Sequence, residues 1–490
     1  RAIDAALSVD ETARPQSADD FRDLLDAPVE TAEEGQEREA ADEAASANQA
    51  DPQPPRPAPP SGIQKKSWLP KALILLVGVL AALITAWYFD IVPMRDSDSK
   101  ENVDDAGYSS TQPSSQTLTQ EEQNQQWFEK AEEFYENDQY TKAVVWYHKA
   151  AEQGHAKAQY FLGIIYRKGK GVPQDGFKAV EWTRKAAEQG HAAAQYNLGL
   201  MYYLGIGVAK DEAKAVEWYR KAAEQGHAGG QNSLGWMYEQ GRGVAQSDSK
   251  SVEWTRNAAE QGNADAQTNL GGMYRQGTGV AQDDAKAVKW FRKAAEQGHA
   301  DAQYILGLMY YQGRGVAQDD AKAVEWYRKA AEQGLAEAQY NLGVRYGKGK
   351  GVSQDDAKAV EWYRKAAEQG NADAQTNLGG MYRQGSGVAK DDAKAVEWYR
   401  KAAEQGYAPT QFNLGNMYRE GRGVRQDYSK AAEWLSKAAE QGYANAQYNL
   451  GFMYANGEGV AKDIPKAIGW IRKAAEQGHE KAQEALKELE

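Results

Sequence analysis

The sequence contains no cysteine in 490 residues, which excludes disulfide bonds, thiolate metal sites and a cysteine nucleophile. Positive charge is also in deficit, since 58 Lys and Arg face 70 Asp and Glu and leave a net charge of -12. Such a chain repels phosphate backbones, so nucleic acid is excluded as an expected partner. The first residue is Arg1 rather than methionine, and we expect the chain to be a piece of a longer polypeptide.

A strict repeat dominates the rest of the chain. Leu-Gly pairs recur every 36 residues from Leu162 and Gly163 onward, and seven of the eight methionines follow the same step. We expect nine full units over 155–478, a variant helix pair at 125–154 and a closing helix at 479–490 that caps the array. Ten tryptophans keep the 36-residue spacing without a slip: Trp146, Trp182, Trp218, Trp254, Trp290, Trp326, Trp362, Trp398, Trp434 and Trp470.

Each unit has the pattern of two helices. In the unit 191–226, apolar residues from Ala194 to Tyr202 follow spacings of three and four and predict a first helix, helix A. After a Gly-x-Gly loop, Asp211 is a suitable N-cap for a second helix, helix B, which stops at Gly226. Because one such pair cannot hide both apolar stripes, pairs must stack on their neighbours. The sequence therefore predicts an all-α, right-handed α-solenoid of helix pairs.

Small residues at fixed positions indicate close helix packing. A glycine inside helix A, such as Gly199, indicates that a side chain of another helix packs closely against the backbone there. We expect the recurring tryptophan to be that side chain, with Gln195 as the hydrogen-bond partner of its indole N–H. On this basis Trp326→Ala should cost about 3 to 5 kcal/mol. The expected repeat core is Trp182, Trp218, Trp254, Trp290, Trp326, Trp362, Trp398 and Trp434.

The helix A positions that change from unit to unit form the candidate binding site. Packing positions must repeat, so positions that drift are expected to be exposed, and aromatic anchors there could hold a protein, a peptide or a cell-wall glycan strand. The residues expected to line this groove are Tyr196, Tyr203, Trp236, Tyr304, Tyr311, Phe412 and Phe452.

The repeat resembles a known family. The string from Ala187 to Ala222, Ala-Glu-Gln-Gly-His-Ala-x-Ala-Gln-Tyr-Asn-Leu-Gly and onward, looks like the Sel1-like repeat, a relative of the tetratricopeptide repeat. The pair at 125–154 has a shorter loop and looks more like a tetratricopeptide unit. The resemblance implies a protein-protein scaffold with a concave helix A surface and no common catalytic residues. Cysteine-rich members linked to β-lactam binding are a poor analogy for a chain without cysteine.

One apolar run predicts a membrane anchor. Residues 72–89 carry no charge, and with its flanks the segment 68–92 is long enough for a transmembrane helix. Four basic residues between 56 and 71 precede it and only Arg95 and Lys100 follow closely, so the positive-inside rule places the N-terminus in the cytoplasm and the repeats outside a bacterial inner membrane. The polar segments 26–67, acidic and proline-rich, and 93–124 are expected to be disordered linkers.

Residues 1–25 look like the C-terminal end of a bacterial Ser/Thr protein kinase domain. Arg14 matches the arginine that pairs with a glutamate in that family, but the glutamate, the Gly-rich loop and the catalytic aspartates are absent from this chain. The order of kinase remnant, linker, span and outer domain resembles that of receptor-type kinases. An unrelated amphipathic helix pair is the alternative for these residues.

No catalytic, cofactor-binding or metal-binding residue is expected. Five of the six histidines share the first position of a unit, so neighbouring copies are too far apart for one metal ion, and we expect them to be solvated helix starts. The chain is therefore predicted to be a non-enzymatic, membrane-tethered interaction scaffold, the sensing or partner-binding part of a receptor-type kinase. An envelope hydrolase or β-lactam-binding or cell-wall-binding protein, and a scaffold without a kinase, remain alternatives.

Overall fold

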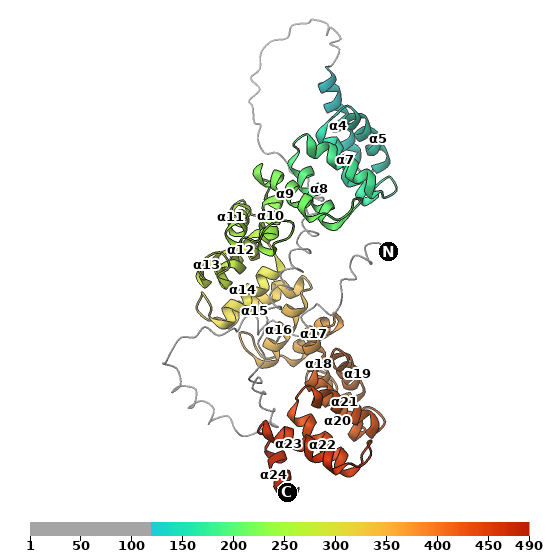
Figure 1. The fold of residues 1–490 in the computed structure, drawn as a ribbon, viewed down its shortest axis with the longest axis vertical. Coiled ribbons are helices and arrows are strands. Elements are labelled where there is room, and N and C mark those ends of the chain that lie inside the picture. Colours follow the sequence, from blue (N-terminus) through green and yellow to red (C-terminus); the bar gives the residue numbers. More distant parts are fainter. Residues whose placement is uncertain (1–118, 490) are drawn as a thin grey trace. The chain divides into compact units, whose positions relative to one another are not determined.

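The computed structural model describes residues 119–489, and all regular structure in that range is helical (Figure 1). The kinase-like stub 1–25, the linker 26–67, the predicted span 68–92 and most of the linker 93–124 lie outside the described residues. None of the helices between residues 119 and 489 has the length and apolar character needed to cross a membrane.

The described helices fall into two compact units, and each is considered by itself. The N-terminal unit ends within and just after α14, and its helices are α4 (Gln120–Glu136), α5 (Tyr140–Glu152), α6 (Ala156–Lys168), α7 (Gly176–Glu188), α8 (Ala192–Leu204), α9 (Glu212–Glu224), α10 (Ala228–Gln240), α11 (Asp248–Glu260), α12 (Ala264–Gln276), α13 (Asp284–Glu296) and α14 (Ala300–Gln312). The C-terminal unit contains α15 (Asp320–Glu332), α16 (Ala336–Lys348), α17 (Asp356–Glu368), α18 (Ala372–Gln384), α19 (Asp392–Glu404), α20 (Ala408–Glu420), α21 (Tyr428–Glu440), α22 (Ala444–Asn456), α23 (Ile464–Glu476) and α24 (Glu480–Leu489).

Both helices of a repeat begin and end at capped residues. The N-cap His191 of α8 accepts a hydrogen bond at Nδ1 from the Ala194 N–H at 3.1 Å. The N-cap Asp211 of α9 accepts one from the Lys214 N–H at 3.0 Å, as the sequence predicts for helix B. α4 begins at Gln120 rather than at the predicted residue 125, because Thr119 and Glu122 form a capping box.

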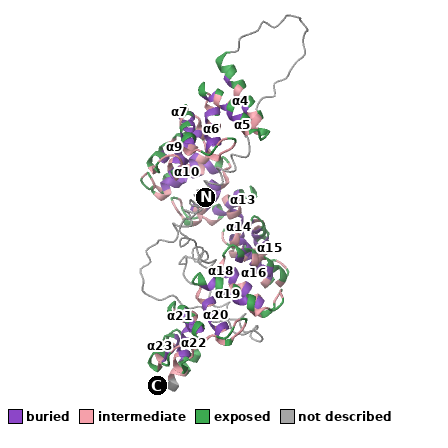
Figure 2. Cartoon of the chain, turned by 90° about the vertical axis from the view of Figure 1, so that its right-hand side faces the viewer, coloured by how far each residue is buried: buried purple, intermediate pink, exposed green. Residues whose placement is uncertain are grey.

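Within each unit, consecutive helices contact one another in chain order, so each helix pair is covered by the next pair. Figure 2 shows buried residues gathered between the helices and exposed residues on their outer sides. The predicted all-α stack of helix pairs is thus confirmed for the described residues.

Each helix A has a glycine whose missing side chain leaves a gap toward helix B, which we call the notch. The residue that fills the notch is the one directly after the tryptophan. A Cβ added to Gly379 of α18 would lie 2.6 Å from the ring of Tyr399 in α19. Tyr399 is only 2% exposed. It stands four residues after Ala395 and three before Ala402, so the three residues share the buried side of α19. The same notch position faces Thr183, Tyr219, Thr255, Phe291, Tyr363, Leu435 and Ile471 in other repeats.

The prediction that tryptophan fills the notch is therefore wrong. Trp182 is 9% exposed, and the other seven members of the expected core, from Trp218 to Trp434, are only partly buried. Neighbouring residues of a helix point in directions about 100° apart. The tryptophan therefore lies at the edge of the buried side of helix B, next to the residue that fills the notch. Its ring supports a lysine three residues later, as in Trp398, where Lys401 Nζ lies 4.0 Å from the ring centroid.

The expected glutamine partners of the indoles have another task. Gln411 of α20 donates to the Ala403 carbonyl of α19 at 3.1 Å and accepts from the Gln441 amide after α21 at 2.8 Å. Because Gln411 is 4% exposed, the two bonds satisfy both polar atoms of a side chain that is hidden from water. This bridge of three helices recurs at Gln159, Gln195, Gln231, Gln267, Gln339, Gln375 and Gln447.

The Gly-x-Gly loops are stacking contacts between repeats. Gly423 has a φ of +69°, and a Cβ there would clash with the Asp392 carbonyl at the start of α19 in the preceding repeat. Glycine is thus required both by the left-handed backbone and by the close approach of another backbone. The loops are turns, as the sequence predicts, and they hold successive pairs together.

Candidate functional site

The positions of helix A that differ between repeats form one stripe, which we call the helix-A face. In α12 this stripe runs through Asp265, Asn269, Gly272 and Arg275, spaced four, three and three residues apart. Such spacing keeps residues on one side of a helix. The helix-A face is therefore separate from the stripe that carries the notch and the glutamine bridge.

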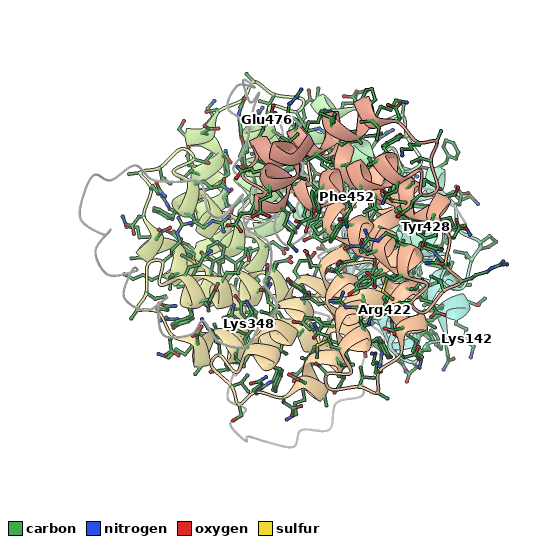
Figure 3. The ribbon with its side chains drawn as sticks, turned by 90° about the horizontal axis from the view of Figure 1, so that it is seen from below. Lys142, Lys348, Arg422, Tyr428, Phe452 and Glu476 are labelled. Atoms are coloured by element: carbon green, nitrogen blue, oxygen red, sulfur yellow. The ribbon has the colours of Figure 1, made fainter. Side chains whose placement is uncertain are left out.

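The predicted groove aromatics are mostly buried. Tyr196 and Tyr203 are each 7% exposed, Trp236 is 9% and Tyr304 is 4% exposed, so the expectation that their rings are open to solvent is wrong. Tyr311 and Phe412 are partly buried, and Phe452, labelled in Figure 3, is 40% exposed. A role in partner binding for any of the seven remains a prediction.

Neighbouring rings account for this burial. Tyr203 and Trp236 meet edge to face with centroids 5.6 Å apart, and Phe412 meets Tyr443 at 5.3 Å. The paired residues are 33 and 31 positions apart in the sequence, so each contact joins one repeat to the next. The aromatic residues thus contribute to stacking as well as to the surface.

The repeated histidines are packed helix caps rather than solvated helix starts. The His227 ring stacks on Tyr196 of the preceding repeat with centroids 5.0 Å apart, and its Nδ1 accepts from the Gly230 N–H at 3.0 Å. Burial lowers the pKa of His227 to about 4, with a smaller contribution from His191. The neutral ring is needed for the cap, since only unprotonated Nδ1 accepts a hydrogen bond.

One histidine differs because it has an acidic neighbour. His299 Nε2 lies 3.0 Å from Asp265 Oδ1, and the two side chains are 15% and 11% exposed. Burial alone would lower the pKa of His299, but the hydrogen bond and charge of Asp265 outweigh it and the pKa is raised. This pair links the helix-A face of α12 to the start of α14.

Acidic residues occupy the start of the helix-A face in four consecutive repeats. They are Asp265 and Asp301 in the N-terminal unit and Glu337 and Asp373 in the C-terminal unit. Burial raises the pKa of Asp301, and Asp265 adds to the rise while His299 opposes it. In both units, basic side chains lie at the other end of helix A, in its last turn and the following loop: Arg167, Lys168, Lys170, Arg242, Arg275, Arg314, Lys348, Lys350, Arg383, Arg419 and Arg422.

Arg242 shows how this basic end is built. It follows α10 and donates from Nη1 to the Tyr203 hydroxyl at 2.8 Å, and it forms an ion pair with Glu212 at the start of α9. Its guanidinium also lies 5.1 Å from the Tyr203 ring centroid and 5.5 Å from that of Trp236. The loop of one repeat thus contacts both helices of the repeat before it.

Arg345 is an exception within the core. It stands where the other full repeats have Met or Ile, and it is only 4% exposed. Its guanidinium carbon lies 3.9 Å from the Tyr311 ring centroid, and Nη1 lies 3.5 Å from Asp320 Oδ1. The sequence reveals this feature as a break in the methionine series, a signal that the sequence predictions did not use.

The arrangement favours recognition over chemistry. Residues 119–489 hold no group of three His, Asp or Glu side chains placed to bind a metal ion. What the surface offers is partly buried aromatic rings and guanidinium groups, which are the residue types enriched in protein interfaces.

Comparison with known proteins identifies the family. The sequence profile described as Sel1 repeat matches residues 135–155 and nine consecutive 36-residue segments from 156–191 to 444–479. The chain belongs to the Sel1 repeat family. The profile begins each full unit one residue later than the predicted boundaries and also matches part of the first helix pair.

Two solved structures show the likeness in three dimensions. A protective antigen of uropathogenic Escherichia coli with an SLR fold is 39% identical, with a TM-score of 0.51 over 75% of this chain and 87% of that one. A Sel1 repeat protein from Oxalobacter formigenes is 36% identical, with a TM-score of 0.50 over 67% of this chain and 93% of that one. A search of curated proteins gave no match.

These findings define the class of function. Sel1 repeat solenoids are typical of protein-protein interaction scaffolds, and proteins of this family are generally non-catalytic. The fold and the family thus agree with the prediction of a protein-binding scaffold.

Proposed function

We propose that this chain binds its protein partner through the helix-A face. The observation that supports this best is a division among positions. The notch, the glutamine bridge and the Gly-x-Gly contact recur with the repeat, whereas the helix-A face changes from Asp265, Gly272 and Arg275 in one repeat to Asp301, Leu308 and Tyr311 in the next. Positions that do not maintain the stack are free to recognise a partner.

Site-specific photocrosslinking tests the proposal. A photoreactive phenylalanine analogue is placed in the full chain on the helix-A face, at Ile305 or Asn413, and at matched exposed positions of helix B, at Glu253 or Glu397. The proposal expects one discrete crosslinked protein from the helix-A positions and none from the helix-B positions. Equal crosslinking from both sets, or crosslinks from helix B alone, would contradict it.

The same proposal extends to the location of the chain. The uncharged run 72–89 and the basic residues before it support a single span, with the N-terminus in the cytoplasm and the repeats outside a bacterial inner membrane. Protease added to spheroplasts should then digest the repeats while residues 1–67 stay protected. Repeats that survive under conditions that digest an outer-surface control protein would reverse this topology.

The resemblance of residues 1–25 to a kinase C-terminus supports a further part of the proposal, that the scaffold is the sensing half of a receptor-type Ser/Thr kinase. Sequencing the gene upstream of Arg1 tests it directly. A Gly-rich loop followed by His-Arg-Asp and Asp-Phe-Gly motifs is the expected result. An upstream region without these motifs would leave a scaffold with no kinase.

A further inference from the structure

The contact between Arg242 and the preceding repeat defines a register that recurs. Arg242 contacts Tyr203, 39 residues earlier, and Glu212, 30 residues earlier. The first residue ends helix A and the second begins helix B of the same repeat. In this repeat the three positions hold one cation and one anion, so their charges balance.

The same register holds an excess of positive charge two repeats later. Arg314 contacts Asp284 through Nε and Nη2, each at 3.3 Å, and the position of Tyr203 is taken by Arg275. Arg314 thus pairs with Asp284, while Arg275 lies within reach of the charges of both. Burial lowers the pKa of Arg275 to about 10, and the charge of Arg314 lowers it further while Asp284 opposes. The Arg275 Nη1 is buried and has no hydrogen-bond partner.

The C-terminal unit contains a second set with the same residues. Arg422 Nη2 lies 3.5 Å from Asp392 Oδ1, and Arg383 stands 39 residues before Arg422. A second carboxylate, Glu420, lies 3.7 Å from Arg422 Nη1 and 3.9 Å from Arg419 Nη2, so this set includes one more ion pair, Arg419 with Glu420. Burial raises the pKa of Tyr399, and the charges of both Arg383 and Arg422 oppose that rise. Each set lies within one compact unit.

Glycine leaves space beside the first arginine of each set. Gly272 lies three residues before Arg275, and a Cβ on it would have no atom within 4 Å. Gly380 holds the same place before Arg383, where the nearest atom to such a Cβ is the Tyr399 hydroxyl at 3.7 Å. Other repeats fill this position with larger side chains, namely Leu200, Trp236, Leu308 and Phe452. A ligand can therefore approach the helix backbone next to the arginine pair.

We propose that Arg275 with Arg314, and Arg383 with Arg422, are two binding sites for side-chain carboxylates of an acidic peptide segment in the protein partner, and that the first, which has the unpartnered guanidinium nitrogen, is the stronger. This inference rests on the proposed function and names the chemistry of the partner. A guanidinium presents paired N–H donors that match a carboxylate, and an unpaired buried cation gains most from an added anion. The first set, with Arg275, Arg314 and Asp284, has a net charge of +1. The second set also has +1 when the Arg419–Glu420 pair beside Arg422 is counted. A single positive charge matches a carboxylate better than a doubly charged phosphate.

The test measures binding of fluorescein-labelled hexaglutamate to the full chain by fluorescence anisotropy at low salt. The double variant Arg275→Gln with Arg383→Gln should weaken binding at least tenfold. The double variant Arg275→Tyr with Arg383→Tyr puts a tyrosine where the balanced repeat has Tyr203. It removes one positive charge from each set and should weaken binding by the same factor. The matched control is Arg256→Gln with Arg364→Gln, which removes helix-B arginines that donate to Tyr274 and Tyr382 at 3.4 and 3.0 Å.

Three results would overturn the inference. The first is that both double variants bind hexaglutamate as tightly as the unmodified chain. The second is that unlabelled hexaglutamine displaces the labelled peptide as well as unlabelled hexaglutamate does. The third is that inorganic phosphate displaces the labelled peptide better than unlabelled hexaglutamate does. Far-UV circular dichroism and urea midpoints equal to those of the unmodified chain show that the variants fold. If the crosslinked partner of Ile305 or Asn413 is retained when these results appear, the carboxylate sites fail while the proposed function stands.

Discussion

The identity of the notch filler leads to a quantitative prediction in the C-terminal unit. Tyr399 is 2% exposed, and its ring would lie 2.6 Å from a Cβ on Gly379. Tyr399→Ala removes a buried ring from an enclosed site and should cost about 3 to 5 kcal/mol. Trp398→Ala removes a partly exposed ring whose place water can enter, so it should cost less, about 1 to 3 kcal/mol.

A double-mutant cycle separates the two candidates more sharply. Gly379→Ala alone forces its new Cβ against the Tyr399 ring and should cost about 1 to 3 kcal/mol. When Gly379→Ala is combined with Tyr399→Ala, much of that clash disappears. The double variant should therefore be more stable than the sum of the two single changes predicts, by at least about 1 kcal/mol. Combined with Trp398→Ala, the costs should simply add.

Equilibrium urea unfolding of the full chain, followed by far-UV circular dichroism, measures these free energies. Because repeat arrays can unfold in parts, hydrogen exchange of α18 and α19 supplies a local measure of the same differences. Coupling of Gly379 to Trp398, with additivity toward Tyr399, would refute the reasoning.

Three further predictions follow from the repeat contacts and from the histidine caps. Gln411→Leu should destabilise the chain by about 1 kcal/mol because it removes two hydrogen bonds of a buried side chain, while the Ala403 carbonyl keeps the Gly406 N–H at 3.1 Å and Gln441 is exposed; urea unfolding checks this, and a loss no larger than that of an exposed helix-B substitution such as Glu397→Gln would disagree. Gly423→Ala should cost more than Gly406→Ala, since both have positive φ but only Gly423 faces another backbone, and thermal melting of the two variants gives the comparison; equal melting points would show that the stacking contact is unimportant. Because the folded state lowers the pKa of His227 from 6.5 to about 4, the stability it contributes is fully present above pH 6.5 and is lost as the pH falls toward 4. His227→Asn, which copies the cap at Asn263, should reduce this acid sensitivity in urea midpoints measured between those pH values, and an unchanged pH profile would count against the cap.

The repeat, the two helices of each unit and their stacking could be predicted from the sequence because they follow periodicity. The spacing of Leu162 and Gly163 and their later equivalents sets the period, and caps such as Asp211 set the helix starts. These signals are local, and short-range geometry converts them into structure with little ambiguity.

The choice of core residue could not be predicted in the same way. The position of Trp398 is Trp in every full repeat, while that of Tyr399 is aromatic in some repeats and Thr, Leu or Ile in others. A difference of one position turns a side chain by about 100°. The invariance of tryptophan reflects its contact with Lys401 and its place at the edge of the buried side of helix B, whereas the filler position tolerates Tyr, Phe, Thr, Leu or Ile opposite the same glycine. Conserved spacing therefore indicates that a position matters without saying what it touches.

The helix-A face was predicted as a location, but its composition was not. Variation among repeats indicated helix A as the binding helix, which stays a prediction. Rings such as Tyr203 and Trp236 are covered by a contact between consecutive repeats, through residues 33 positions apart in the sequence. The arginine sets were missed for a similar reason, because Arg275 and Arg314 belong to different repeats and meet only when loops stack on the preceding pair. Residues that come together across repeat boundaries can be found from sequence once the register of one such contact is known.

Hydrogen exchange of the full chain with and without the protein captured by crosslinking tests the central claim most directly. If the partner binds the helix-A face, amide exchange should slow in helix-A elements such as α12, α14, α18 and α20. Exchange in the helix-B elements α13 and α19 should stay unchanged. Protection confined to the helix-B elements, or none within residues 119–489, would contradict the account.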